Sequence, residues 1–159
     1  MTNGTYHLAQ VNIASMVAPI DSEIMSGFVA RLDEINAVAD GHDGFVWRLQ
    51  TDEGDATALR PYEDERIIVN MSVWESVDTL FDYTYKSKHL ELLKSRWSWF
   101  EHMKDFHMCM WWIPAGTIPT TDDAKHRLAY MIDKGISPYA FTFKQRYTIE
   151  EMLEYSVVK

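Results

Sequence analysis

The chain has 159 residues, 47% hydrophobic and 13% aromatic, with a formal net charge of −9 and a pI near 5.0. This length favours one domain whose core needs neither disulfides nor metals. The acidic balance argues against nucleic-acid binding, which requires clustered Lys and Arg. The single cysteine, Cys109, lies in the apolar run MCMWWIP. We interpret it as a buried small hydrophobic residue in a reducing compartment.

The N-terminus and the hydropathy pattern argue against membrane targeting. MTNGTYHLAQ has neither the basic nor the apolar region of a signal peptide. No stretch approaches the roughly eighteen consecutive apolar residues of a membrane span. We therefore expect a cytoplasmic protein without a membrane partner.

The first half of the chain predicts a strand, a helix and two further strands. YHLAQVNIA, residues 6–14, alternates like a half-buried strand, and apolar residues then recur at helical spacing until GHDG at 41–44. FVWRLQT, residues 45–51, is the second strand, and IIVNMSVWES, residues 67–76, contains the third. The long polar segment between them, residues 52–65, is a candidate flap over a bound molecule.

The second half predicts a helix, a strand and a further helix. Ser76 is a good N-cap for a long helix that ends near WSWF, residues 97–100. HMCMWWIPAG contains the fourth strand. Thr120 and Asp123 form a capping-box-like start for a helix that stops at Gly135.

The order of elements predicts the fold class. A βαββαβ chain with right-handed crossovers gives an α+β ferredoxin-like sandwich, with strand order 4-1-3-2 and both helices on one face. We expect one domain over residues 1–147 and a C-terminal extension over 148–159, where TIEEMLEY adds a short helix. The other face of the sheet is left bare.

Alternation along the central strands sorts their side chains between two faces. In the third strand Ile67, Val69, Met71 and Val73 share a face that suits packing on helices. We expect the opposite, polar face to point away from the helices. If the larger apolar residues of the second strand also pack on helices, the polar face comprises Gln10, Asn12, Arg48, Gln50, Asn70, Ser72 and Trp74.

This polar face has two interpretations. A sheet face that carries aromatic residues as well as amides is rarely left to solvent, so the sheet of a second subunit is the natural cover. The face is then either a wet homodimer interface whose amides satisfy one another, or a ligand cavity with apolar walls and a few polar groups.

Several segments together resemble the DUF3291 family, a domain of unknown function, from about Tyr6 to about Phe143. They are HLAQVNIA, GFVWRLQTDEGDATA, VNMSVWES, WSWFE, MWWIPAG and AFTF. The resemblance implies a dimeric α/β barrel similar to the antibiotic-biosynthesis and heme-degrading monooxygenases, with two ferredoxin-like sheets face to face. It implies no particular reaction, because the wider superfamily includes cofactor-independent oxygenases, heme enzymes, isomerases and non-catalytic binders.

His89 is the candidate cofactor ligand. It lies four residues after Tyr85 and three before Leu92, on the apolar stripe of the long helix. Heme-degrading relatives carry an axial histidine on this helix, although alignment from WES places that ligand near Leu93. The alternative is a hydrogen-bonded core histidine.

No motif for other chemistry is present. The histidines have no metal-site spacing, so we expect no metal ligands. The absence of a serine elbow, a phosphate-binding glycine loop and a CxxC pair leaves hydrolase, kinase and nicotinamide functions without support.

The leading hypothesis is a cytoplasmic homodimer that binds a flat, largely apolar or aromatic small molecule between its sheet and helices, with a monooxygenase-like oxidation as its candidate reaction. Arg48 would neutralise a carboxylate or enolate, while Asn12 and Asn70 orient a carbonyl or dioxygen. The expected ligand-binding residues are Gln10, Gln50, Ser72, Trp74 and Tyr85. No cofactor is required in this reading. A heme protein with His89 as axial ligand and a non-catalytic dimerisation or ligand-binding module are the alternatives.

Overall fold

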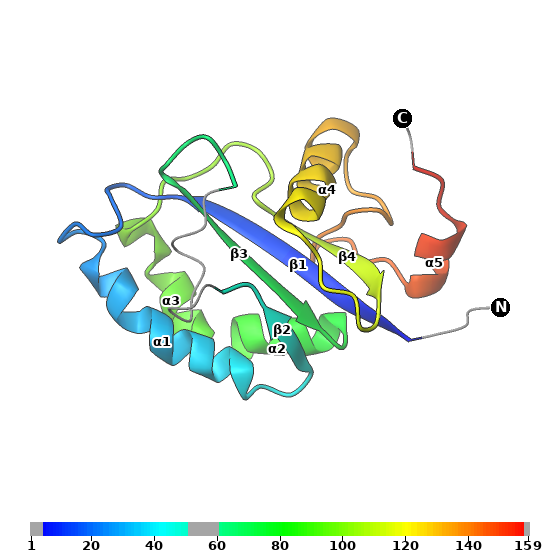
Figure 1. Cartoon of the computed structure of the whole chain (residues 1–159), viewed down its shortest axis with the longest axis horizontal. Helices are drawn as coiled ribbons and strands as arrows, with labels where there is room; N and C mark the ends of the chain where they lie inside the picture. The colour runs from blue at the N-terminus through cyan, green and yellow to red at the C-terminus, as the bar shows by residue number, and fades with distance from the viewer. Residues whose placement is uncertain (1–4, 51–60, 158–159) are drawn as a thin grey trace.

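The computed structural model describes residues 5–50 and 61–157. Its centre is a four-stranded antiparallel sheet in the order β2-β3-β1-β4, with helices on both sides (Figure 1). The strands are β1 (Tyr6–Ser15), β2 (Phe45–Arg48), β3 (Ile67–Trp74) and β4 (Met108–Pro114). This order confirms the predicted ferredoxin-like sandwich. The candidate flap lies mostly outside the described residues.

The helices follow the predicted order, with one difference in the middle of the chain. They are α1 (Ser26–Asp40), α2 (Val77–Lys86), α3 (His89–Lys94), α4 (Thr121–Lys134) and α5 (Ile149–Glu154), with a short 3₁₀ turn, η1 (Arg96–Ser98). The single long helix predicted after Ser76 is therefore divided into α2, α3 and η1.

Ser87 causes this division. Its backbone is extended, and its hydroxyl donates to the carbonyl of Tyr83, one turn back in α2. The same oxygen accepts from the backbone N–H of His89 at 3.1 Å, at the start of α3. The Ser87 hydroxyl thus provides a hydrogen-bond partner for a backbone group at the end of α2 and for another at the start of α3. Such local side-chain bonds favour a break over a continuous helix. The break changes the direction of the chain immediately before His89.

The predicted helix caps are confirmed. Ser76 and Thr79 form a reciprocal capping box at the start of α2, and Thr120 and Asp123 form another at the start of α4. Gly135 ends α4 with φ of 90°, a conformation that L side chains rarely adopt.

The prediction that the polar sheet face points away from the helices is wrong. Leu8 and Trp74 share that face with Gln10 and Asn70, and both pack against Leu80 of α2 in one buried cluster. Figure 1 shows α1, α2 and α3 together on this side of the sheet. Polar side chains such as Gln10 and Asn70 are tolerated on this face because they line a cavity beneath the helices.

The opposite, apolar sheet face is covered by α4. Val11 of β1 and Met71 of β3 are each only 1% exposed, and they cluster with Leu128 and Met131 of α4. Figure 1 shows α4 on the side of the sheet opposite α1 and α2. Both faces of the sheet are therefore covered within one chain.

The residues of β2 do not alternate as predicted. A register irregularity lies between Phe45 and Trp47. Phe45 consequently pairs with Trp74 on the cavity side, whereas Trp47 pairs with Val73 and packs on the α4 side. Arg48 returns to the cavity side, opposite Ser72.

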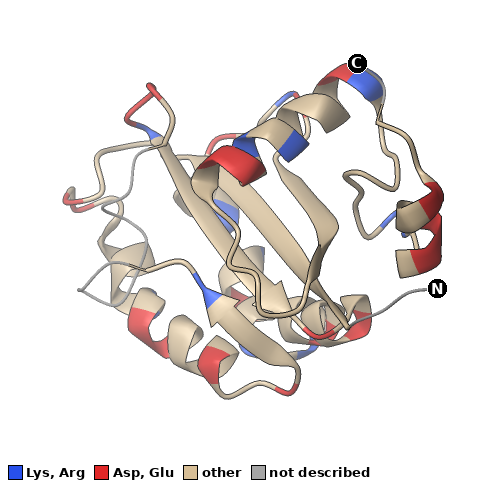
Figure 2. Cartoon of the chain, turned by 45° about the vertical axis from the view of Figure 1, so that its right-hand side comes forward, with Lys and Arg blue, Asp and Glu red and all other residues tan. Residues whose placement is uncertain are grey.

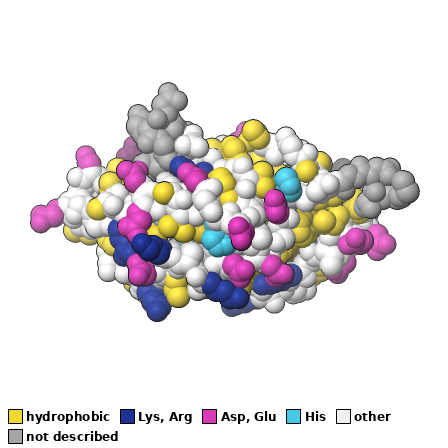
Figure 3. All heavy atoms as spheres, turned by 90° about the horizontal axis from the view of Figure 1, so that it is seen from below, with side chains coloured by type: hydrophobic (Ala, Val, Ile, Leu, Met, Phe, Trp, Pro, Cys, Tyr) yellow, Lys and Arg dark blue, Asp and Glu magenta, His cyan; other side chains and the backbone are white. Residues whose placement is uncertain are grey.

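The surface carries its acidic excess on helices. Figure 2 shows Asp and Glu residues, in red, along α1, at the start of α4 and on α5. The lower face of the molecule, by contrast, mixes cationic, anionic and hydrophobic side chains (Figure 3). Within the described ranges, none of the helices has the length and apolar character needed to cross a membrane.

Candidate functional site

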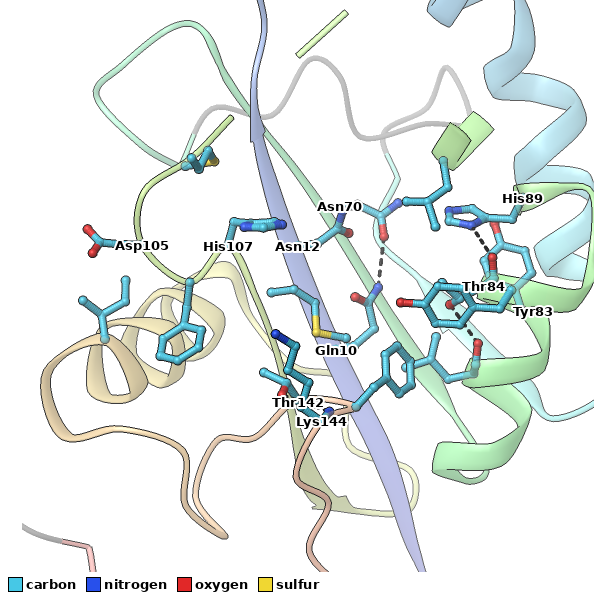
Figure 4. A pocket seen from close by; sticks show the side chains of 18 of the residues that line it. Gln10, Asn12, Asn70, Tyr83, Thr84, His89, Asp105, His107, Thr142 and Lys144 are labelled. Atoms are coloured by element: carbon cyan, nitrogen blue, oxygen red, sulfur yellow. Dashed lines mark hydrogen bonds between the residues drawn. The ribbon is translucent and has the colours of Figure 1, made fainter. Parts of the chain in front are cut away.

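A cavity of about 640 Å³ lies between the polar sheet face and helices α2 and α3. Figure 4 shows Gln10, Asn12 and Asn70 rising from the sheet, with Thr84 and His89 on the helical side. Leu80, Tyr83, Tyr85, Leu93, Met108 and Phe143 supply apolar and aromatic walls. Its dimensions and mixed lining are typical of sites for small organic molecules.

The sheet side of the cavity has a hydrogen-bonded amide floor. Gln10 Nε2 donates to Asn70 Oδ1 at 3.0 Å and to Ser72 Oγ at 2.8 Å. These two bonds use both N–H groups of Gln10. The Asn70 carbonyl is thereby occupied, which leaves the Asn70 amide N–H groups as donors toward the cavity.

Trp74 anchors this floor from below. Its indole Nε1, which can only donate, bonds Ser72 Oγ at 2.8 Å. The indole is fully buried and stacks on the ring of Tyr83, with centroids 5.0 Å apart. The aromatic pair therefore links the floor to the α2 wall, and it holds the orientation of Ser72 and Gln10.

Tyr83 is a protonated wall residue. Burial raises the pKa of its phenol well above the usual value. Its hydroxyl donates to the carbonyl of Ile35 in α1 at 3.4 Å. Tyr83 is thus a neutral donor that ties α2 to α1.

His89 is the titratable group on the helical side. Its Nδ1 lies 3.1 Å from the carbonyl oxygen of Thr84, which can only accept, so the neutral ring carries its proton on Nδ1. Burial lowers the pKa of His89, and the Thr84 bond opposes this shift only in part. The unprotonated Nε2 has no hydrogen-bond partner within the described ranges and is available as a proton acceptor.

A charged rim surrounds the other end of the cavity. Lys104, Asp105 and His107 come from the segment before β4, and Lys144 comes from the segment after the bridge between Met110 and Phe141. In Figure 4, Asp105 lies at the end of the cavity farthest from His89, and His107 lies between Asp105 and Asn12. The cavity therefore has an uncharged inner end and an ionic outer end.

The structure brings five of the nine predicted site residues to the cavity lining. These are Gln10, Asn12, Asn70, Tyr85 and His89. Ser72 and Trp74 lie directly beneath the floor and support it through hydrogen bonds.

Arg48 and Gln50 lie outside the cavity lining. The guanidinium of Arg48 pairs with Asp40 at the end of α1, with Nε 2.7 Å from Oδ1. Gln50 is exposed just beyond the edge strand β2. The Asp40 carboxylate already neutralises the Arg48 guanidinium. The expectation that Arg48 neutralises a ligand therefore gains no support from this geometry.

Sequence reasoning missed the Tyr83 wall and the charged rim. The predicted apolar stripe ran through Tyr85 and Leu92, whereas α2 buries Val77 and Leu80 and turns Tyr83 inward. The spacing i, i+3, i+6 of these three residues was the available signal. The rim residues lie in connecting segments, where no periodicity indicates direction.

Candidates for metal binding and nucleophilic chemistry are few. No group of three or more His, Cys, Asp or Glu side chains is positioned to hold a metal ion anywhere in the described residues. Cys109 is fully buried on the α4 side of the sheet, and burial raises the pKa of its thiol to about 12. An unionised buried thiol is a poor nucleophile.

Comparison with solved structures finds distant likenesses. SnoaB, a cofactor-independent oxygenase from Streptomyces nogalater, is 16% identical, and the match covers 72% of this chain and 98% of SnoaB with a TM-score of 0.46. PA3566 from Pseudomonas aeruginosa is 9% identical, with 73% and 100% covered and a TM-score of 0.47. A putative antibiotic biosynthesis monooxygenase from Nitrosomonas europaea is 12% identical, with 76% and 98% covered and a TM-score of 0.46. No curated protein matches the chain.

The family comparison covers nearly all of the chain. The matching family model is described as a domain of unknown function, DUF3291, and the match extends over residues 7–156. It includes the sheet, both cavity helices, α4 and α5. The chain therefore belongs to the DUF3291 family.

Proposed function

We propose that this protein binds a flat, largely apolar small molecule in the cavity and oxidises it with dioxygen, in the manner of a monooxygenase that needs no cofactor. The observation that carries this proposal is the neutral His89, whose ring lines an apolar-walled cavity that has an amide floor and whose Nδ1 is engaged by Thr84. The ring of the ligand would lie between Tyr83 and Phe143, and its oxygen atom would accept from Asn70.

The polar groups fit a substrate with an acidic proton next to a carbonyl or on a phenol. Asn70 offers a donor to an oxygen on which negative charge develops, and His89 offers the acceptor for the proton. The apolar walls near His89 reduce contact with water, so the fixed dipole of the Asn70 amide would contribute to stabilising the resulting enolate or phenolate. Asn12 would orient dioxygen or a second substrate oxygen.

This reaction balances without an external reductant. An anthrone or a phenol loses a proton to His89, and the carbanion form of the ring then transfers electrons to dioxygen. One oxygen atom ends in a new carbonyl group and the other ends in water, so that anthrone plus dioxygen gives anthraquinone plus water. The ring supplies all four electrons that dioxygen takes up.

Oxygen uptake with anthrone tests this activity. We expect consumption above the rate in buffer, with anthraquinone as product. His89→Gln should lower the catalysed rate by about 10²–10⁴-fold, the usual contribution of a general base. His126→Gln is the matched control, because His126 is exposed on α4 and lies outside the lining. Uptake at the buffer rate, or equal rates in wild type and His89→Gln, would exclude this chemistry.

Heme binding is the second candidate, favoured by the same histidine. A ring that donates Nδ1–H to a backbone carbonyl and presents Nε2 is the usual arrangement of an axial ligand. Leu93, the other position considered for the ligand, also lines the cavity but cannot ligate iron. Bound heme would supply oxygen chemistry at its iron. A Soret band that appears with hemin and disappears in His89→Ala, but not in His126→Ala, would establish it.

We also propose that the protein is a homodimer. Val11 and Met71 on one sheet face, and Leu8 and Trp74 on the other, are already covered within one chain. The contact between subunits is therefore expected outside both sheet faces. A native mass spectrum that contains only monomer at micromolar concentration would contradict the dimer.

A further inference from the structure

We propose that the ligand is an anion, whose carboxylate or equivalent acidic group lies at the cavity rim and is attracted by the positive charges of Lys104 and Lys144. This inference rests on the proposed small-molecule function and adds the charge class of the ligand. The two lysines reach the same cavity from segments that are about forty residues apart in the sequence, before β4 and after α4.

The ammonium groups of Lys104 and Lys144 have no protein partner among the described residues. Neither Lys104 nor Lys144 makes a side-chain hydrogen bond or ion pair within the part of the chain that is described, and the same holds for Lys94, which lies outside the lining. Three lysines elsewhere pair with carboxylates, namely Lys86 with Asp82, Lys88 with Glu34 and Lys134 with Asp133. Lys125 donates to the carbonyl of Pro61 at 2.8 Å.

The charge of the cavity lining differs from that of the whole chain. The chain has 24 acidic and 15 basic residues, so a random lining would carry net negative charge. The lining instead contains Lys104 and Lys144 against one carboxylate, Asp105. Figure 4 places Lys144 beside Thr142 and well apart from Asp105, so that carboxylate does not neutralise it.

The position of the charges fits an amphipathic anion. The inner end, at Tyr83 and His89, is aromatic, whereas Lys104 and Lys144 lie elsewhere in the lining and are exposed to solvent. A ligand with a ring system at one end and an acidic group at the other would match both regions. Lysine suits the outer end because its ammonium is a compact charge on a flexible stem that adapts to an anionic oxygen.

Two fluorescent probes of similar shape test the proposal. 8-Anilinonaphthalene-1-sulfonate is an anion, and N-phenyl-1-naphthylamine is its neutral counterpart. We expect the full-length protein to bind the anion more tightly. Lys104→Met and Lys144→Met should each weaken anion binding by about twofold to fivefold, the range of a solvent-exposed ion pair. Neither change should alter the affinity for the neutral probe.

The opposite substitution and two controls complete the experiment. Asp105→Asn should tighten anion binding by a similar factor, because it removes a like charge from the rim. Lys86→Met, outside the lining, should change neither affinity. Asn12→Phe fills the cavity floor and should weaken both probes if they bind there.

The outcomes separate this inference from the proposed function. If both probes bind and Asn12→Phe weakens both, but the lysine variants leave anion affinity unchanged, the cavity is a ligand site and the anion proposal is wrong. If neither probe binds, or Asn12→Phe has no effect on either, the proposed function fails at the level of the cavity itself. Anion binding that sodium chloride does not weaken would also contradict the role of the lysines.

Discussion

The Nδ1 atom of His89 lies 3.1 Å from the carbonyl oxygen of Thr84, five residues earlier in the chain. This contact exists because Ser87 ends α2 and starts α3, so that the imidazole turns back over the last turn of α2. It fixes the tautomer of the ring. The proposed role of His89 as a general base depends on this contact.

A first prediction concerns the pH dependence of stability. Burial lowers the pKa of His89 in the folded state below its unfolded value of about 6.5. The unfolded chain therefore binds more protons than the folded chain below that pH, and stability falls as the pH drops from 6.5 toward the folded pKa. We expect His89→Gln to lose less of its Tm than wild type between pH 7 and pH 5. Parallel profiles of Tm against pH would show that His89 is not buried in its neutral form.

The second prediction concerns the hydroxyl that supports the amide floor. Ser72→Ala leaves the buried donors of Gln10 and Trp74 without their shared acceptor, which should lower the free energy of unfolding by about 1–3 kcal/mol. Ser15→Ala is the matched control, because Ser15 is equally buried at 7% exposure but makes no side-chain hydrogen bond among the described residues. Urea denaturation of both variants measures the difference. Equal losses would mean that the Ser72 bonds add nothing.

The third prediction concerns the packing of α4 on the sheet. Leu128 is 2% exposed within the cluster on the apolar sheet face, so Leu128→Ala should lower the free energy of unfolding by about 2–5 kcal/mol. Ile118→Ala, at a side chain that is 61% exposed, should change it by less than about 0.5 kcal/mol. A small effect at Leu128 in urea denaturation would indicate that α4 is not firmly docked on this face.

A fourth prediction concerns the thiol of Cys109. Burial raises its pKa to about 12, so the native protein should not react with Ellman's reagent at pH 8. One thiol per chain should react after unfolding in guanidinium chloride, since the chain has one cysteine. Fast reaction of the native protein would contradict the burial of β4 beneath α4.

The order of the elements was predictable from the sequence because strong local signals mark their ends. Ser76 and Thr120 are capping residues, and Gly135 has the positive φ that ends a helix. Alternation also placed Gln10 and Asn70 on the same face of the sheet. The antiparallel pairing of β1 with β3 makes them diagonal neighbours on that face.

The direction of that face was not predictable from alternation, which separates two faces without saying what covers each. The apolar face packs on α4, and the polar face lines a cavity under α2. The division of the long helix at Ser87 and the register irregularity before Trp47 depend on single hydrogen bonds and on strand pairing. The hydrophobic periodicity of a whole segment does not detect a helix break or a strand irregularity at a single residue.

The most direct test of the central claim is an NMR titration of the ¹⁵N-labelled protein with N-phenyl-1-naphthylamine. The account predicts that amide shifts concentrate at Gln10, Asn70, Tyr83, His89 and Phe143, around one cavity. Asn12→Phe should abolish these shifts. Shifts centred instead on exposed hydrophobic residues such as Ile24 and Ile118, with the cavity residues unchanged, would contradict the claim that this cavity is the binding site.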